Sequence, residues 1–421
     1  MDKFVITGGK KLYGEVNVSG AKNASLALMP ATILAAGKST LYNTPELNDV
    51  YTMMKLLNQL GVSTSFKNST LELDSSRITS QVAPYEHVKK MRASVYVLGP
   101  LLTRFGNAKV SLPGGCAWGP RPINLHLEAL KKMGANINLV EGYIDAKSKR
   151  LQGAKINFDV SSVGATGNTL MAAVLAKGTT IITNAAMEPE ITNLAEFLIK
   201  MGARIDGLNT SVLTIEGVDD LNSSEMITIP DRIEAGTLLI AGAITGGNVT
   251  IKNINEKLLN ALLLKIEDSG RNFKIRNNLI ELLSAENRIV PTDITTSIFP
   301  GFPTDMQAQW TAYMCLAGGV CTVTDTIYLD RFKHVPELIR LGADIQVNEN
   351  QAVIRGVDKL TGAKVMSTDL RASASLVLAG LAAKGTTEVL RVYHLDRGYQ
   401  KIEEKLKLLG AQIERVAGTE Y

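Results

Sequence analysis

One short phrase recurs six times along the chain and sets the organisation that the chain can adopt. In each copy a helical pattern ends on Gly and a strand pattern follows, as in Leu341-Gly342-Ala343 before Asp344-Ile345-Gln346-Val347. Gly favours the left-handed conformation that ends many helices. We therefore expect six units of about 70 residues, each with strands and helices in a βαβ-like order. The six glycines, spaced by 73, 68, 68, 72 and 68 residues, are Gly61, Gly134, Gly202, Gly270, Gly342 and Gly410.

A second phrase recurs in phase with the first: a polar entry, an Ala- and Leu-rich helix, and a closing Gly before a strand. The apolar spacing of Val95, Leu98 and Leu102 predicts one such buried helix. Helix N-termini attract anions but disfavour cations, so a cation there indicates another role, such as anion binding. Ordinary polar capping remains the alternative for any single copy. The charged residues 14 or 15 positions before the closing Gly are Lys22, Arg92, Arg232, Asp305 and Arg371.

Composition limits the class of protein further. Of 421 residues, 45% are hydrophobic and 20% charged, which is typical of a folded protein, and the net charge of +4 gives no indication of a nucleic-acid or membrane partner. Three Cys cannot build a disulfide scaffold, so we expect a reducing, cytoplasmic compartment. The first residues lack the apolar run of a signal peptide, and no uncharged apolar stretch of about 18 residues occurs elsewhere.

Several motifs do not carry the chemistry that they suggest. Gly37-Lys38-Ser39-Thr40 resembles part of a phosphate-binding loop, but Thr32 stands where the earlier Gly is required. The histidines and the pair Cys315 and Cys321 show no metal-ligand spacing, and we expect both thiols to be buried. We therefore predict no metal and no cofactor.

The segment 112–122 contains three Pro and three Gly, which predicts a loop that carries Cys116 and Trp118. Approach of Arg121 would lower the pKa of the Cys116 thiol. A loop Cys is often inert, but glycines and a Trp on the same loop favour a lid over a substrate pocket.

These residues closely resemble the UDP-N-acetylglucosamine 1-carboxyvinyltransferase (enolpyruvyl transferase) family, and the match runs nearly end to end. The resemblance implies an α/β fold: a two-lobed, inside-out α/β barrel with three repeats per lobe. The chain would cross between lobes twice, giving lobes 22–229 and 1–21 with 230–421. The motifs that carry the resemblance are Ser19-Gly20-Ala21-Lys22-Asn23-Ala24, Pro113-Gly114-Gly115-Cys116 with Arg121-Pro122, Phe302-Pro303-Thr304-Asp305-Met306-Gln307, Arg331-Phe332-Lys333-His334-Val335-Pro336, Asp369-Leu370-Arg371-Ala372-Ser373 and Tyr393-His394-Leu395-Asp396-Arg397-Gly398.

The resemblance implies transfer of the enolpyruvyl group of phosphoenolpyruvate to the 3′-hydroxyl of UDP-N-acetylglucosamine, with release of phosphate, as the first committed step of peptidoglycan synthesis. The catalytic residues would be Cys116 as the acid toward C3 and the target of fosfomycin, Asp305 as the base, Lys22 and Arg397. The residues that would bind phosphoenolpyruvate are Lys22, Asn23, Arg121, Arg331, Arg371 and Arg397. Those that would bind UDP-N-acetylglucosamine are Asn23, Arg92, Arg121, Pro122, Ile123, Asn124, Leu125, Ser162, Val163, Gly164, Asp305 and Ile327.

The chain departs from the family at one position. Val160 stands where many members carry Lys, before Ser162-Val163-Gly164, which puts a cationic contact to the diphosphate in doubt unless Lys155 replaces it. Two other functions remain open: the shikimate 5-enolpyruvyl transferase reaction, and an inactive paralogue that binds UDP-sugars. We expect a monomer whose lobes close on UDP-sugar binding.

Overall fold

Each repeat builds one small sheet in the computed structural model, which describes residues 2–89, 91–112 and 123–418. Within these residues the strands form six four-stranded sheets, each with one parallel pair and two antiparallel pairs. In the third repeat, for example, β10 and β11 are parallel, while β13 pairs antiparallel with β11 and β12. The βαβ-like order expected from the sequence is therefore followed by an antiparallel hairpin.

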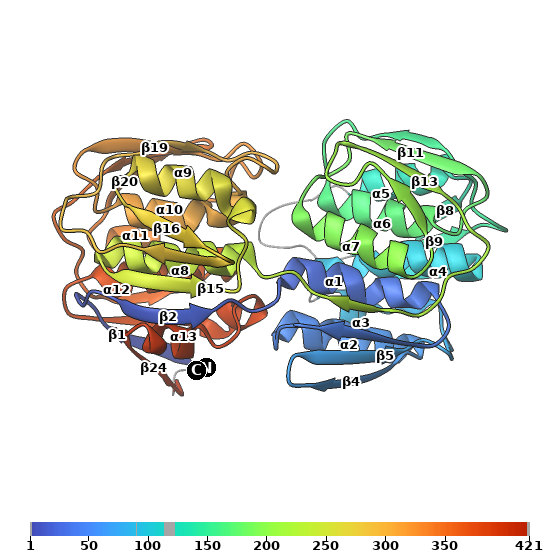
Figure 1. Ribbon diagram of the computed structural model, residues 1–421, viewed down its shortest axis with the longest axis horizontal. Coiled ribbons are helices and arrows are strands. Elements are labelled where there is room, and N and C mark those ends of the chain that lie inside the picture. The colour runs from blue at the N-terminus through green and yellow to red at the C-terminus, as the bar shows by residue number, and fades with distance from the viewer. Residues whose placement is uncertain (1, 90, 113–122, 419–421) are drawn as a thin grey trace. The chain divides into compact units, whose positions relative to one another are not determined.

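The chain divides into two compact units, unit 1 (Met1–Ser19 with Pro230–Tyr421) and unit 2 (Gly20–Ile229), each with three of these sheets (Figure 1). The strands of unit 2, in sheet order, are β14 (Glu225–Ile227), β3 (Lys38–Tyr42), β5 (Thr70–Asp74) and β4 (Ser63–Lys67); β6 (Val82–Ala83), β7 (Asn107–Ser111), β9 (Tyr143–Lys147) and β8 (Asn136–Val140); β10 (Lys155–Asn157), β11 (Thr179–Thr183), β13 (Val212–Glu216) and β12 (Arg204–Asp206).

Unit 1 repeats this arrangement. Its strands, in sheet order, are β16 (Phe273–Arg276), β17 (Leu279–Leu282), β15 (Asn248–Lys252) and β2 (Tyr13–Asn17); β18 (Ile294–Thr295), β19 (Val320–Thr324), β21 (Gln351–Arg355) and β20 (Asp344–Asn348); β22 (Lys364–Met366), β23 (Thr386–Leu390), β1 (Lys3–Thr7) and β24 (Gln412–Val416).

Segments distant in sequence complete both units. Strands β1 and β2, from the start of the chain, each join a sheet built by residues after 230. In unit 2, β14 is the last strand in sequence and pairs with β3, which is the first. The chain therefore leaves unit 1 after Ser19 and returns at Pro230.

Helices fill the interior of each unit and sheets lie outside, which is the inside-out arrangement (Figure 1). The inner helices are buried on all sides: α8 from Arg232 to Ile244, and α10 along its whole length. Such helices suit positions where other helices surround them. The inner helices are α1 (Lys22–Ala31), α4 (Leu98–Phe105), α6 (Val163–Ala173), α8 (Arg232–Thr245), α10 (Gln307–Met314) and α12 (Leu370–Ala382).

The remaining helices bury one face only. Helix α2 buries Val50, Met53, Leu57 and Leu60, the spacing of a single apolar stripe. These helices are α2 (Asn48–Leu60), α3 (Tyr85–Val88), α5 (Asn124–Lys132), α7 (Pro189–Lys200), α9 (Asn260–Asp268), α11 (Val335–Arg340) and α13 (Ile402–Leu408), and the 3₁₀ segments are η1 (Thr32–Leu34), η2 (Arg92–Val97), η3 (Glu256–Leu259), η4 (Thr304–Met306) and η5 (Val392–Arg397). Among the described helices, none combines the length and apolar character needed to cross a membrane.

The glycines that defined the repeat adopt the expected conformation. Each of the six has a φ between 80° and 111°, in the left-handed region, directly before a strand. The closing glycines of the second phrase do the same, except Gly319 among those described. Helix α10 ends at Met314, and the carbonyl of Gly319, directly before β19, accepts a hydrogen bond from the N–H of Gly356 at 2.9 Å.

Two inner helices begin differently from the expectation. Arg92 and Asp305 lie in the 3₁₀ segments η2 and η4, and the α-helices that follow start at Leu98 and Gln307. Val95 is therefore buried in a 3₁₀ segment rather than an α-helix. Pro100 explains the later start of α4, because Pro lacks an N–H and is tolerated only in the first turn of a helix.

Candidate active site

In unit 1, Asp305 joins two arginines that are distant in sequence. Its Oδ1 accepts a hydrogen bond from Arg331 Nη2 at 2.8 Å, and its Oδ2 accepts one from Arg371 Nη2 at 2.7 Å. The Arg331 and Arg371 side chains are 8% and 5% exposed, whereas Asp305 is 27% exposed. The result is a carboxylate that solvent can reach, fixed at both oxygens by buried guanidinium groups.

Arg371 lies in the first turn of α12, where a cation is disfavoured by the helix dipole. The N-cap residue Asp369 offsets this by accepting hydrogen bonds from the backbone N–H groups of Arg371 and Ala372 at 2.9 and 3.0 Å. Burial is the largest single effect and lowers the pKa of Arg371, but Asp305, Tyr399 and Asp231 together raise that pKa above its usual value. The ring of Tyr399 lies 5.5 Å from the guanidinium carbon and closes its other side.

A second carboxylate, Asp325, connects this cluster to the loop after β19. Its Oδ2 accepts a hydrogen bond from the Thr304 hydroxyl at 2.7 Å, and Thr304 Oγ1 accepts one from Arg331 Nη1 at 2.9 Å. Its Oδ1 accepts the backbone N–H of Ile327 at 2.9 Å. The half-buried Ile327 is thereby tied to the same network as Asp305.

Arg397 ends η5, a 3₁₀ segment that packs against α12. Burial and the positive charge of Arg397 lower the pKa of His394, while Asp369 at the start of α12 raises it. Arg397 therefore lies on a segment that contacts α12, the helix that carries Arg371 in its first turn.

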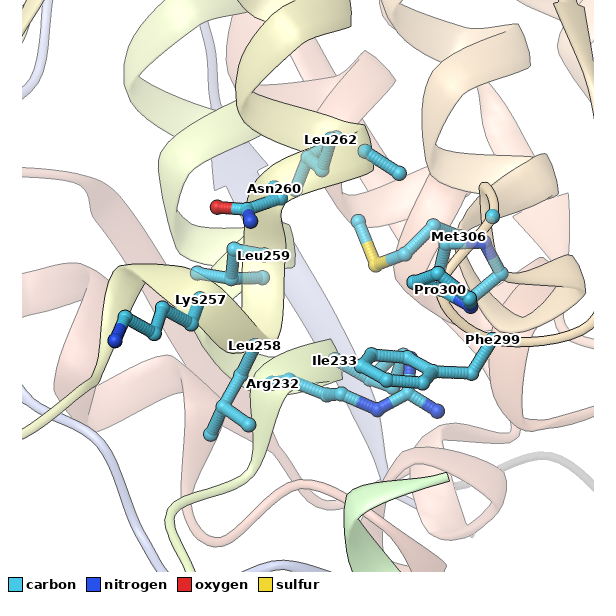
Figure 2. A pocket seen from close by; sticks show the side chains of 13 residues that line it. Arg232, Ile233, Lys257, Leu258, Leu259, Asn260, Leu262, Phe299, Pro300 and Met306 are labelled. Carbon is cyan, nitrogen blue, oxygen red and sulfur yellow. The ribbon is translucent and has the colours of Figure 1, made fainter. Parts of the chain in front are cut away.

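A small pocket opens beside the start of α8, lined by Arg232, η3, the start of α9 and residues of the segment from Phe299 to Met306 (Figure 2). The Arg232 guanidinium carbon lies 5.6 Å from the centre of the Phe299 ring. The residues that line the pocket are mostly apolar, and Pro303 and Met306 flank Asp305 in sequence. The pocket thus borders the Asp305 turn without containing the paired arginines.

In unit 2, Lys22 begins α1 and faces Asp49 in the first turn of α2, with Nζ and Oδ2 3.6 Å apart. Their side chains are 14% and 6% exposed. The N-cap residue Ala21 makes no side-chain cap, so the first N–H groups of α1 receive no side-chain acceptor from it. Asn23, next in the chain, is exposed.

Arg92, the start of α5 and the start of α6 meet around His126. The His126 ring accepts a hydrogen bond at Nδ1 from Asn168 Nδ2 (3.1 Å), and a Cβ added to Gly164 would lie 3.1 Å from its Nε2. Burial, and secondarily the Arg92 charge, lower the pKa of His126 to about 4. His126 is therefore neutral near pH 7, and its ring packs closely against Gly164.

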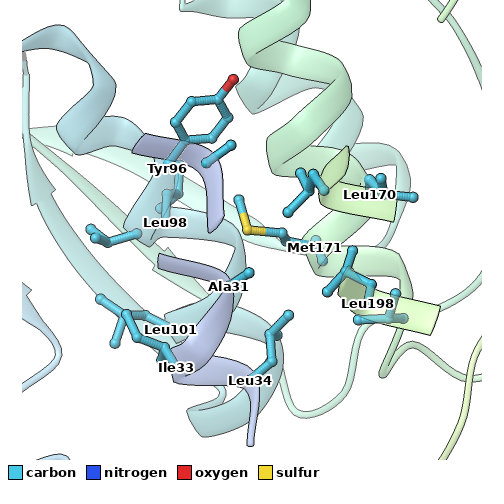
Figure 3. Close-up of a cluster of buried hydrophobic side chains, with 14 of the residues drawn as sticks. Ala31, Ile33, Leu34, Tyr96, Leu98, Leu101, Leu170, Met171 and Leu198 are labelled. Atoms are coloured by element: carbon cyan, nitrogen blue, oxygen red, sulfur yellow. The ribbon is translucent and has the colours of Figure 1, made fainter. Parts of the chain in front are cut away.

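This arrangement gathers the segments predicted to hold the UDP-sugar. Ile123, Asn124 and Leu125 directly precede His126, and Ser162 caps α6 by accepting the N–H of Ala165 at 3.3 Å. The supporting core is drawn in Figure 3, where side chains of α1, η1, α4, α6 and α7 pack around Met171. Val160 is 65% exposed and offers no charge, and Lys155 is an exposed residue at the start of β10.

Three predicted site residues, Cys116, Arg121 and Pro122, lie outside the described residues. The other two cysteines are buried, as expected. Burial raises the pKa of Cys321 to about 11, and raises that of Cys315 further, so both remain thiols. Among the described residues, no group of three or more His, Cys, Asp or Glu could hold a metal ion.

Comparison with known proteins identifies the family. The family model described as EPSP synthase (3-phosphoshikimate 1-carboxyvinyltransferase) matches residues 6–406. The UDP-N-acetylglucosamine 1-carboxyvinyltransferase of Chloroherpeton thalassium is 58% identical over 100% of this chain and 99% of its own length. That of Chlorobium limicola is 57% identical over 100% of both chains. The chain belongs to the UDP-N-acetylglucosamine 1-carboxyvinyltransferase family.

Solved structures confirm the fold expected for a member of this UDP-N-acetylglucosamine 1-carboxyvinyltransferase family. The enolpyruvyl transferase NikO from Streptomyces tendae superposes with a TM-score of 0.89 at 24% identity, covering 98% of both chains. The EPSP synthase of Acinetobacter baumannii superposes with a TM-score of 0.77 at 17% identity, covering 99% of this chain and 100% of that one. The inside-out α/β architecture is thus shared with both.

Sequence reasoning missed several residues that hold the site of this carboxyvinyltransferase family member. Asp49, His126, Asn168 and Asp325 are buried polar residues in contact with predicted site residues or their neighbours. A polar residue between apolar neighbours, such as His126 between Leu125 and Leu127, is the available sequence signal. Alone it does not distinguish a supporting residue from an isolated one.

Proposed function

We propose that the chain transfers the enolpyruvyl group of phosphoenolpyruvate to the 3′-hydroxyl of UDP-N-acetylglucosamine and releases phosphate, the first committed step of peptidoglycan synthesis. The observation that carries this proposal is the Asp305 carboxylate held between two buried guanidinium groups. That cluster combines a proton acceptor with groups suited to a carboxylate substrate. The full-length likeness to UDP-N-acetylglucosamine 1-carboxyvinyltransferases supports the choice of acceptor.

In the addition step, the sugar 3′-oxygen bonds to C2 of phosphoenolpyruvate while C3 gains a proton. We assign the acid toward C3 to Cys116 and the acceptor of the hydroxyl proton to Asp305. An ionised carboxylate has about four lone-pair positions, so Asp305 can accept the sugar hydroxyl while it holds both arginines. Its 27% exposure leaves room for that contact.

In the elimination step, C3 loses a proton, the C2=C3 double bond forms again, and the bond from C2 to the phosphate oxygen breaks. Lys22, Arg121 and Arg397 would stabilise the leaving phosphate, and Arg331 and Arg371 would bind the substrate carboxylate. The addition forms one C–O bond and the elimination breaks another and releases phosphate, with only protons moving otherwise, so the chemistry requires no redox cofactor.

The UDP-sugar would lie along unit 2 residues at helix starts. Asn23 lies in the first turn of α1, and Arg92 begins η2, which leads into α4. Ile123–Leu125 begin α5 and Ser162–Gly164 begin α6, where backbone N–H groups suit a diphosphate. Asp305 and Ile327 would contact the sugar, and Arg121 and Pro122 would complete the nucleotide site. Val160 supplies no cation there, so backbone contacts carry more of the binding.

Phosphate release tests the proposal. We expect release from phosphoenolpyruvate with UDP-N-acetylglucosamine, without added metal, and loss of most activity in Cys116→Ser. Release with shikimate 3-phosphate alone would assign the other acceptor, and no release with either would indicate an inactive paralogue.

The proposal includes a monomer in the cytoplasm. A reactive Cys116 thiol needs a reducing compartment. Sedimentation of the pure protein with both substrates measures the oligomeric state, and a dimer would contradict this part.

A further inference from the structure

Asp325 is a fully buried carboxylate at the end of β19 that satisfies four donors. Its Oδ1 accepts the Thr296 hydroxyl at 2.8 Å and the backbone N–H groups of Ile327 and Tyr328 at 2.9 Å each. Its Oδ2 accepts the Thr304 hydroxyl at 2.7 Å. One side chain thus fixes both the 326–328 loop and the turn that carries Asp305.

The direction of the hydrogen bonds in this network follows from chemistry. A guanidinium group only donates, so Thr304 Oγ1 must accept from Arg331 Nη1, and its own hydrogen then points to Asp325. Arg331 Nη2 in turn donates to Asp305 Oδ1 at 2.8 Å. Donation therefore starts at Arg331 and runs two ways, directly to Asp305 and through the Thr304 hydroxyl to Asp325, so the two carboxylates are connected by three hydrogen bonds.

We propose that Asp325 is a positioning residue, which sets the orientation of the Asp305 carboxylate through Thr304 and Arg331 and fixes Ile327 through the backbone. This inference rests on the proposed function, because it makes Asp325 the residue that holds the base and the sugar-contacting loop in register. Proton transfer depends steeply on geometry, so loss of this support should lower turnover even when the fold persists.

The hydrogen bond from Arg371 to Asp305 stays in place when the Asp325 network is broken, and this limits the expected loss of turnover. Arg371 holds Oδ2 independently of Asp325, through its own place in α12. Removing the Thr304 connection therefore loosens one oxygen of Asp305 rather than both. We expect kcat to fall by about 10- to 100-fold, the range produced by small misplacements of a reacting group.

Two variants break the chain at different bonds. Asp325→Asn replaces one acceptor oxygen by an N–H donor of equal size: at the Oδ1 position the amide opposes the two backbone N–H groups, and at the Oδ2 position it takes away the acceptor of the Thr304 hydrogen. Thr304→Val removes the connecting hydroxyl at constant shape, and Thr304→Ser restores it. The matched control is Asp293→Asn, because Asp293 also accepts a backbone N–H, that of Thr322 at 2.7 Å, but is exposed and outside this network.

We expect both chain-breaking variants to lower kcat, the double variant to be no worse than the more severe single one, and Thr304→Ser and Asp293→Asn to keep wild-type kcat. Unfolding transitions of each variant separate this effect from loss of fold. Additive losses, or unchanged kcat in both chain-breaking variants, would overturn the positioning role.

The test separates this inference from the proposed function. No phosphate release by the wild type with UDP-N-acetylglucosamine would overturn the proposed function, and the variants would then be compared with whichever acceptor supports turnover. Amide exchange gives a readout independent of turnover: Asp325→Ala should accelerate exchange at Ile327 and Tyr328, whereas Thr304→Val should not. Equal exchange in wild type and Asp325→Ala would overturn the hold on the loop.

Discussion

The two units share one architecture but hold their polar interiors in different ways. In unit 1, Asp305 contacts two guanidinium groups at 2.7 and 2.8 Å, and Glu234 pairs with Lys405 at 2.6 Å. In unit 2, Lys22 and Asp49 stand 3.6 Å apart, and the neutral pair His126 and Asn168 joins the helix starts. Both units thus hold charged groups in their interiors, but the ion-pair distances given for unit 1 are shorter than that of Lys22 and Asp49 in unit 2, where a neutral His–Asn contact lies at the helix starts.

The segments that connect the units show the same contrast. Ser19, the last residue of the first segment of unit 1, is held by Glu234, whose Oε2 accepts its N–H at 2.6 Å. In unit 2 the neutral Asn193 contacts the backbone of Ile227 and Ile229, each at 3.2 Å. Charged contacts respond to pH and salt and neutral ones do not, so the two units should differ under those conditions.

The largest expected difference is catalytic. Asp305→Asn should lower kcat by about 10²- to 10⁴-fold, because the proposed base is lost. Asp49→Asn, the matching change in unit 2, should lower kcat/KM less than about tenfold, because it only loosens Lys22. Steady-state phosphate release measures both. Equal losses would contradict the separate roles of the two carboxylates.

Next in size is the buried ion pair of unit 1. Burial raises the pKa of Glu234, and Lys405 counteracts this by holding the carboxylate. Lys405→Met should lower the free energy of unfolding by about 3–5 kcal/mol, because it leaves that acid without its cation. Denaturant unfolding measures this, with the exposed Lys401→Met as the control. A change no larger than the control would show that Glu234 is stable without its partner.

Acid should destabilise the molecule through its buried histidines. Burial lowers the pKa of His126 to about 4 and that of His334 to about 3, from 6.5. Above about pH 6.5 these histidines are neutral in both the native and the unfolded state. As the pH falls toward 4, the unfolded chain gains protons that the native state excludes, so the free energy of unfolding decreases by up to about 3 kcal/mol for His126.

His126→Gln should flatten this pH dependence between 6.5 and 4. Unfolding at several pH values measures it, and His87→Gln, at a partly exposed position of α3, is the control. An identical slope in His126→Gln and the wild type would mean that His126 is protonated in the native state.

The smallest expected effect concerns the hydrogen bonds of the neutral Asn193 side chain in unit 2. Asn193→Ala should cost about 1–3 kcal/mol of unfolding free energy, because it removes two part-buried hydrogen bonds to the backbone of Ile227 and Ile229. Unlike the Lys405 effect, it should not change with salt. Asn107→Ala, an exposed position, is the control. A salt-dependent loss in Asn193→Ala would contradict the contrast between the charged Glu234 contact of unit 1 and the neutral Asn193 contact of unit 2.

Local signals predicted much of the fold. The left-handed conformation that Gly adopts after a helix depends on local backbone geometry and not on tertiary contacts. The spacing of Gly61 and its five equivalents therefore revealed the repeat from sequence alone. The residues before α4 were predicted to be α-helical but form the 3₁₀ segment η2, although Pro100 was visible in the sequence. The roles predicted for Lys22, Asp305 and Arg397 came from motif resemblance, and they remain predictions.

The sequence by itself determined the six repeats, the buried inner helices and the family, because periodicity and motifs are properties of neighbouring residues. Only the tertiary structure revealed that Asp305 meets Arg331 and Arg371, 26 and 66 residues away, and that Asp325 supports them through Thr304. Contacts of this kind depend on how helices and loops pack within a unit. The residues around a buried carboxylate in the sequence do not indicate which distant residues it will contact.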